Sequence, residues 1–328
     1  ACQAGTPDVA PPTDAPLPAP LMVTTANDPA ATPDIPAPTL TNPAPQNTEP
    51  APAVTPLPRL SAGAKLKLNQ IHMFPDGTGW ALGGAADQAD LPYRVLRTQD
   101  NARTWFDLTP PEPAPAPGSP EKTAIAFFSD SLHAWVTFGP PDPKDHAHQP
   151  VVWRTSDGGA TWQSSQVLQE ARLDTVYAPS ILFFSDAQHG WLMSHHGAAA
   201  GHTPVSIFKT TDGGLTWSIV ARPMDEASYP LHTCCQSGLL FFEDSQTGLV
   251  ARDGGPIPLP HVLRTTDSGA TWQQVDIPEP SAGLYTSHYC TTGSLQRLSG
   301  MSAALVMNCM DFEPGGALFS YRHEWLPA

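Results

Sequence analysis

One nine-residue phrase recurs along the chain and constrains its fold more than any other feature. It reads RTSDGGATW at residues 154–162, KTTDGGLTW at 209–217 and RTTDSGATW at 264–272, with a weaker copy, RTQDNARTW, at 97–105. The copies start at positions 97, 154, 209 and 264, which are 57, 55 and 55 residues apart. A near-constant period of this size predicts a repeat architecture.

Each repeat unit carries the signals of four short strands. An apolar run that ends in aromatic-x-Asp is followed, after a tight turn, by a second apolar run; a third strand then enters the phrase and a fourth follows its Trp. The aromatic-x-Asp runs occupy residues 71–76, 125–130, 181–186 and 239–244. Aromatic and β-branched enrichment without helical periodicity indicates strands, and four strands per unit are typical of a β-propeller blade.

The sequence therefore predicts an all-β protein, a β-propeller of four-stranded antiparallel blades. The blades are expected at about residues 65–110, 122–168, 178–222, 236–278 and 294–328. Five blades are counted, or six or seven in the parent protein if the chain is truncated. The fifth unit has lost the phrase, and its strands are expected at 295–298, 303–308, 317–322 and 323–326. Neighbouring terminal strands would close the ring and remove exposed edges.

Residues 1–60 form a separate region that is rich in Pro, Ala and Thr. Such a composition buries too little apolar surface to offset chain entropy, so we expect a disordered, polyproline-like tether in front of a propeller at residues 61–328. The alternative is an ordered strap across the surface of another protein.

Cysteines and the N-terminus suggest a compartment. Ala1-Cys2 resembles the end of a bacterial lipoprotein signal, which makes Cys2 a candidate lipid anchor; a truncated secreted chain is the alternative. Bridges from Cys234 or Cys235 to Cys290 or Cys309 are expected, with buried free thiols as the alternative. Both features favour an extracytoplasmic protein, at the cell surface or secreted.

Charge restricts the partners. The chain has 16 basic and 31 acidic residues, for a net charge of -15. This balance argues against binding to nucleic acid or to an anionic membrane surface. No apolar run is long enough to span a bilayer, so no transmembrane segment is expected.

The repeated phrase places Asp and Gly at a hairpin turn, where the carboxylate accepts backbone N–H groups and Gly permits positive φ. It resembles the Asp-box, or bacterial neuraminidase repeat, of sialidases, other glycoside hydrolases and sortilin-type receptors. That resemblance implies a folding element on the hairpin of strands three and four, remote from any catalytic centre. Its structural residues here are Asp100, Trp105, Asp157, Gly159, Trp162, Asp212, Gly214, Trp217, Asp267, Gly269 and Trp272.

The combination of aromatic-x-Asp, Gly-Trp and the phrase, over residues 65–275, is most similar to the photosystem II assembly and stability factor family. The resemblance implies a scaffold or assembly role. Members of that family have more blades, and their basic surface is missing from this acidic chain.

Loops between strands two and three lie opposite the repeated turns and are the expected place for binding. Five histidines in these loops could bind Zn or Cu, with solvated imidazoles as the alternative. These metal candidates are His146, His148, His195, His196 and His202.

The sequence gives little evidence for a group of catalytic residues. The Phe-Arg-Ile-Pro stretch of sialidases is absent, and Arg97, Arg154 and Arg264 belong to the repeats. Four aspartates recur with the period and are expected to cap the turn after strand one: Asp76, Asp130, Asp186 and Asp244. The recurring Phe and Trp residues are expected in the core. Loop acids such as Asp174, Asp225 and Glu226 could form a glycoside hydrolase pair.

The sequence thus favours a non-catalytic, extracytoplasmic propeller, tethered to the cell surface, that binds another protein or a surface polymer as an interaction, scaffold or assembly module. No catalytic residue and no cofactor are assigned beyond the metal candidates. A secreted glycan-active hydrolase is the alternative function.

Overall fold

A computed structural model describes residues 59–86, 94–111, 124–139, 150–168, 178–196, 204–222, 231, 238–252, 261–277, 288–297, 303–311 and 318–325. The chain divides into two units, residues 1–52 and 53–328, and every described residue belongs to the second. Residues 1–58 of the predicted tether, Cys2 among them, lie outside the described residues, as do Cys234 and Cys235.

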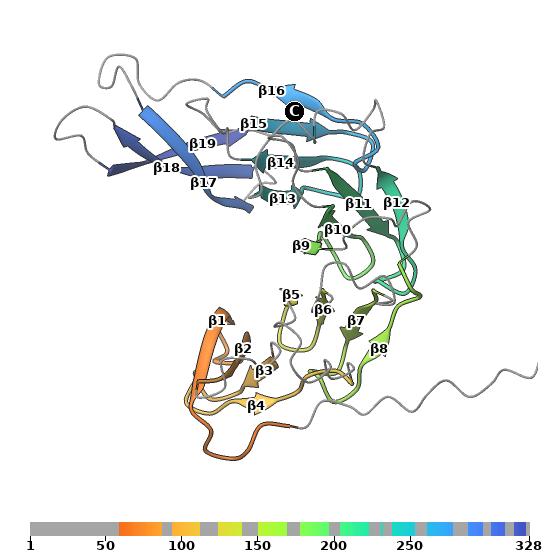
Figure 1. Ribbon diagram of the computed structural model, residues 1–328, viewed down its shortest axis with the longest axis vertical. Helices are drawn as coiled ribbons and strands as arrows, with labels where there is room; N and C mark the ends of the chain where they lie inside the picture. Colours follow the sequence, from red (N-terminus) through yellow and green to blue (C-terminus); the bar gives the residue numbers. More distant parts are fainter. Residues whose placement is uncertain are drawn as a thin grey trace, which may run out of the picture. The chain divides into compact units, whose positions relative to one another are not determined.

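The described residues form five antiparallel sheets, in each of which strands that follow one another in the chain are hydrogen-bonded neighbours (Figure 1). The first two sheets contain β1 (Leu66–Met73), β2 (Gly79–Ala85), β3 (Arg94–Thr98) and β4 (Phe106–Asp107), then β5 (Ala124–Phe128), β6 (Ala134–Phe138), β7 (Val152–Thr155) and β8 (Gln163–Ser164). The next two contain β9 (Ala178–Phe184), β10 (Gly190–His195), β11 (Val205–Thr210) and β12 (Ser218–Ala221), then β13 (Gly238–Phe242), β14 (Gly248–Arg252), β15 (His261–Thr265) and β16 (Gln273–Val275). The fifth contains β17 (His288–Arg297), β18 (Ala303–Asp311) and β19 (Leu318–Trp325).

This arrangement confirms the predicted all-β fold, built from four-stranded antiparallel sheets of the propeller-blade type. Neighbouring sheets pack in chain order, with β5 beside β9, β9 beside β13 and β13 beside β17. Closure of the ring between the first and fifth sheets remains a prediction.

The fifth sheet differs from the prediction. Residues 317–322 and 323–326 were expected to form two strands, but β19 runs through both segments. Its residues pair with β18 without interruption, from Leu318 opposite Met310 to Trp325 opposite Ala303. No turn residue separates the two segments, so the backbone stays extended and the described part of this sheet has three strands.

The cores between sheets confirm the predicted role of the recurring aromatics. The Trp of a second strand stacks on the Phe that ends the first strand of the next sheet, a contact that contributes about 0.5–1.5 kcal/mol beyond burial. Three such pairs occur: Trp80 with Phe128 (centroids 5.6 Å apart), Trp135 with Phe184 (4.0 Å) and Trp191 with Phe242 (3.5 Å).

The same three indoles also hydrogen-bond to the next sheet. Their Nε1 groups donate to the backbone oxygens of Asp130, Gly213 and Ser268, respectively, at 2.8–2.9 Å. Because each buried N–H has an acceptor, burial of the indole leaves no unpaired donor.

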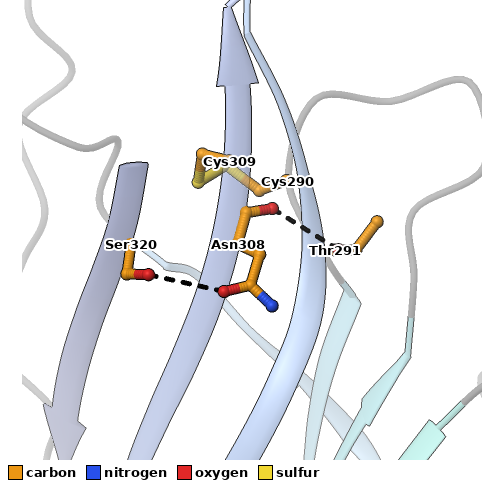
Figure 2. Close-up of a disulfide and its surroundings, with 5 residues drawn as sticks. All are labelled: Cys290, Thr291, Asn308, Cys309 and Ser320. Atoms are coloured by element: carbon orange, nitrogen blue, oxygen red, sulfur yellow. Dashed lines mark hydrogen bonds between the residues drawn. A yellow bond between two sulfur atoms is a disulfide. The ribbon is translucent and has the colours of Figure 1, made fainter. Parts of the chain in front are cut away.

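One disulfide joins Cys290 and Cys309 on adjacent strands β17 and β18 (Figure 2). The two residues are directly opposite in the register, with Cα atoms 4.0 Å apart, and both are buried. The expected bridge from either residue to Cys234 or Cys235 is therefore wrong. Strand pairing brings the two distant cysteines within bonding reach of each other, which spacing in the sequence does not show.

Candidate functional site

The four repeated turns hold their polar groups internally. In the second copy, the Asp157 carboxylate accepts hydrogen bonds from Thr155 Oγ1 (2.8 Å), Thr161 N (2.9 Å) and Thr161 Oγ1 (2.5 Å). Bonds from Thr161 and Thr155 lower the pKa of Asp157 to about 2. Asp100, Asp212 and Asp267 make the equivalent three bonds in the other copies.

These turns also fasten neighbouring sheets together. Arg97 Nη1 donates to the backbone oxygen of Gly158 at 3.2 Å, and Arg154 Nη1 donates to that of Asp212 at 3.1 Å. Arg97 and Arg154 thus each bind the turn of the following sheet. The phrase is explained by folding, since its Asp carboxylates and the Nη1 groups of Arg97 and Arg154 form hydrogen bonds within the protein.

The aspartates that end the first strands have the predicted capping role. Asp130, for example, accepts hydrogen bonds from the backbone N–H groups of Leu132 and His133 at 2.7 and 2.8 Å. Asp76, Asp186 and Asp244 make the same kind of bond to the backbone two or three residues further on.

A different set of polar side chains lies at the opposite ends of the strands, between the third and fourth sheets. Side chains alternate between the two faces of a strand. His195 therefore shares the face of Trp191 and Met193, which pack against the fourth sheet. Arg252 shares the face of Val250 by the same rule, and this face packs against the third sheet.

His261 completes this group, because it is paired with Arg252 and shares the face of the core residue Leu263. His195, Arg252 and His261 thus face one another where the shared core ends. We call these three residues the basic cluster.

The basic cluster is poorly solvated. Arg252 is 2% exposed, while His195 and His261 are partly exposed. Burial, followed by the charges of Arg252 and His196, lowers the pKa of His195 to about 4. Burial and the charge of Arg252 lower the pKa of His261 too. Both imidazoles are therefore neutral at pH 7 beside a buried guanidinium.

Nδ1 of His195 is buried and has no hydrogen-bond partner among the described residues. A negatively charged group bound at the basic cluster would raise both histidine pKa values.

Of the five predicted metal ligands, His146, His148 and His202 lie outside the described residues. His195 and His196 are adjacent, so they point to opposite faces of the strand. The His196 ring is 2.6 Å from Ser206 Oγ, whereas His195 joins the basic cluster. Within the described ranges, no three His, Cys, Asp or Glu side chains gather as a metal site would require. The metal site remains a prediction, as does the acid pair, because Asp174, Asp225 and Glu226 are not among the described residues.

Sequence reasoning missed Arg252 and His261, although the repeat itself contained the signal. Counting from the start of the second strand, Arg252 stands where the other sheets have Gly83, Phe138 and Ser194. A charge at a position that is otherwise small, apolar or uncharged breaks the repeat.

No known family model matches the chain, and no curated protein is similar to it. Several solved structures align with it weakly. A structure described as YCF48 bound to D1 peptide gives a TM-score of 0.42 at 12% identity, over 83% of this chain and 74% of that one. A putative exo-beta-1,3-galactanase from Bifidobacterium bifidum gives a TM-score of 0.44 at 11% identity, over 76% of this chain and 89% of that one.

The GH93 alpha-L-arabinofuranosidase of Fusarium graminearum gives a TM-score of 0.40 at 15% identity, over 61% of each chain. At these scores, neither a binding function nor a hydrolase function is inferred from the alignments. Among the described residues, no helix is long and apolar enough to cross a membrane.

Proposed function

We propose that the protein is a non-catalytic interaction module, a propeller of the Asp-box type that binds another protein or a surface polymer through the strand ends at the basic cluster. The observation that supports this function most is the convergence of His195, Arg252 and His261 from two sheets. The cluster stands opposite the repeated turns, where a rigid scaffold presents its variable loops.

The group that such a site takes is an anion, for example the side-chain carboxylate of an acidic protein segment or a sulfate of a polymer. His195 and His261 are partly exposed and would contact it, whereas the buried Arg252 would attract it through its charge. Desolvation strengthens this attraction because the local dielectric constant is low.

The chain's context in the cell is part of the same proposal. The Pro-rich residues 1–60 would act as a tether, anchored at Cys2, that places the module outside the cytoplasm. The disulfide between Cys290 and Cys309 agrees with an oxidising compartment.

Binding of the full chain to immobilised polymers tests this function. Poly-glutamate and dextran sulfate serve as anionic probes, and neutral dextran and poly-lysine as controls. We expect binding to the two anionic probes only, with weaker binding in His195→Gln and in Arg252→Met. The matched control, Thr271→Ala, alters a repeated turn and should bind like the wild type.

Two results would overturn the proposal. One is equal binding of all four polymers by the wild type and both cluster variants. The other is release of sugar from a polysaccharide panel that is abolished by substitution of Asp174, Asp225 or Glu226, which would favour the hydrolase function.

A further inference from the structure

The first copy of the repeated phrase departs from the others at the residue after its Trp. Phe106 stands there, whereas the other sheets have Gln163, Ser218 and Gln273. All four positions are exposed, and the Phe106 side chain is 55% exposed. A large aromatic ring at a position that is otherwise polar needs a reason other than folding of the repeat.

Phe106 also removes a hydrogen-bond acceptor. In the second sheet, Arg154 is paired with Gln163, whose Oε1 accepts from Arg154 Nε at 3.3 Å and Nη2 at 3.0 Å. In the first sheet, Arg97 is paired with Phe106 instead. Nε of Arg97 is buried and has no partner among the described residues, which leaves this side of the guanidinium in need of an acceptor.

A hollow of about 300 Å³ lies at this place. Phe106 and Leu108 line it together with Arg97, Gln99, Asp157, Gly158 and Ala160. It therefore combines apolar side chains with the polar groups of Arg97, Gln99 and Asp157.

The chain enters the propeller beside this hollow. Arg59 donates to the backbone oxygen of Thr109 at 2.8 Å and to Asp107 Oδ1 at 3.3 Å, and the backbone N–H of Leu60 donates to Asp107 Oδ2 at 3.0 Å. Asp107 directly follows Phe106 and also forms an ion pair with the buried Arg94. These bonds fix the start of the described chain next to Phe106.

The six residues before Arg59 are Ala-Val-Thr-Pro-Leu-Pro, at positions 53–58. In the polyproline II conformation they would extend about 19 Å, which is enough to cross the hollow from its rim. Proline-containing segments in this conformation dock in aromatic-lined grooves, and their backbone carbonyls are free to accept hydrogen bonds.

We propose that the hollow at Phe106 is a docking site for an extended proline-containing peptide, and that residues 53–58 of this chain occupy it. Pro56 and Pro58 would pack on Phe106 and Leu108. Direct covalent continuity gives the segment an effective concentration of order millimolar, so a weak contact suffices. This inference is independent of the basic cluster.

Hydrogen–deuterium exchange of the full chain tests the proposal, read out on peptides that cover residues 53–60. We expect Phe106→Gln, which restores the residue of the second copy, to speed exchange there about two- to tenfold, as loss of one aromatic contact implies. Replacing Pro56 and Pro58 by Ser in the tether should have the same effect without touching the sheets. Combining both changes should add nothing further.

Gln273→Ala, at the equivalent position of the fourth sheet, is the matched control and should leave exchange at residues 53–60 unchanged. Exchange at the rate of an unstructured peptide in the wild type would overturn the proposal. So would protection that disappears on dilution, which would assign the hollow to a second copy, or protection that arises only when an added proline-containing peptide is present, which would assign it to a partner.

Discussion

The two ends of the strands in the third and fourth sheets differ in how their polar groups are satisfied. At the turn end, Asp212 and Asp267 each accept three hydrogen bonds from neighbouring threonines. At the opposite end, Arg252 is buried beside two histidines whose pKa values are lowered by burial and by its charge. Among the described residues, the first arrangement recurs with the repeat and the second occurs at one junction.

This difference separates folding from function. A repeated polar group with all its bonds inside its own turn stabilises the blade and has nothing left to offer a ligand. Arg252, by contrast, breaks the repeat and lies beside His195 and His261, whose pKa values are lowered by burial and by its charge. Substitutions at the two ends should therefore have opposite signatures in binding and in stability.

The largest effect is expected at Arg252. Arg252→Met removes the buried charge that attracts the anion, so affinity for dextran sulfate should fall about 30-fold (~2 kcal/mol). Isothermal titration calorimetry measures this loss, and thermal unfolding of the same variant shows whether the fold persists. Arg252→Lys keeps the charge and should retain part of the affinity; equal loss in both variants with an intact fold would contradict an electrostatic role.

The turn end should show the converse signature. Asp157→Ala removes an acceptor of three hydrogen bonds in an exposed turn, and should lower the free energy of unfolding by about 1–2 kcal/mol. Denaturant unfolding measures it. Affinity for dextran sulfate should not change, and a variant with full stability but weakened binding would break the comparison between the two ends.

The pH of the solution should affect binding at the basic cluster. The pKa of His195 is about 4 in the free protein, below its ordinary value of 6.5, and a bound anion would raise it. Binding then takes up a proton, so affinity for dextran sulfate should increase several-fold as pH falls from 6.5 to 5. A His195→Gln variant should lose most of this dependence, and the remainder would belong to His261.

The fold was predictable because its determinants are local and repeated. Thr155, Asp157 and Thr161 lie within one turn, so their spacing alone indicates the hydrogen bonds that form. The strand order followed because each strand pairs with the next in the chain. Where the repeat decays, in the fifth sheet, the strand boundaries were wrong and the pairing of Cys290 with Cys309 was missed.

The basic cluster was less predictable because its members are distant in sequence. His195 was singled out as a metal candidate together with His196, but strand alternation sends the two side chains to opposite faces. Arg252 and His261 join His195 only through packing of the third sheet on the fourth. Composition and spacing do not show which strand-end residues of one sheet lie against those of the next sheet.

The smallest effect is expected inside the weak first copy of the phrase. Ala102 has a φ of 63°, at the position of Gly159 and Gly214 in later copies. A left-handed conformation costs a residue with a Cβ about 1–2 kcal/mol relative to its usual basins. Ala102→Gly relieves this strain but gives the unfolded chain more freedom, so a net gain of about 0.5–1 kcal/mol in unfolding free energy is expected.

Ser268 provides the matched test, because it too is a non-glycine residue with positive φ, at 67°. Its hydroxyl donates to the backbone oxygen of Ser245 at 2.6 Å, and this bond offsets the strain. Ser268→Gly should therefore bring no gain, since strain and hydrogen bond are lost together. Equal stabilisation by both glycines in denaturant unfolding would show that the bond contributes nothing; a gain confined to Ala102→Gly would establish that the first copy retains strain which the fourth has compensated.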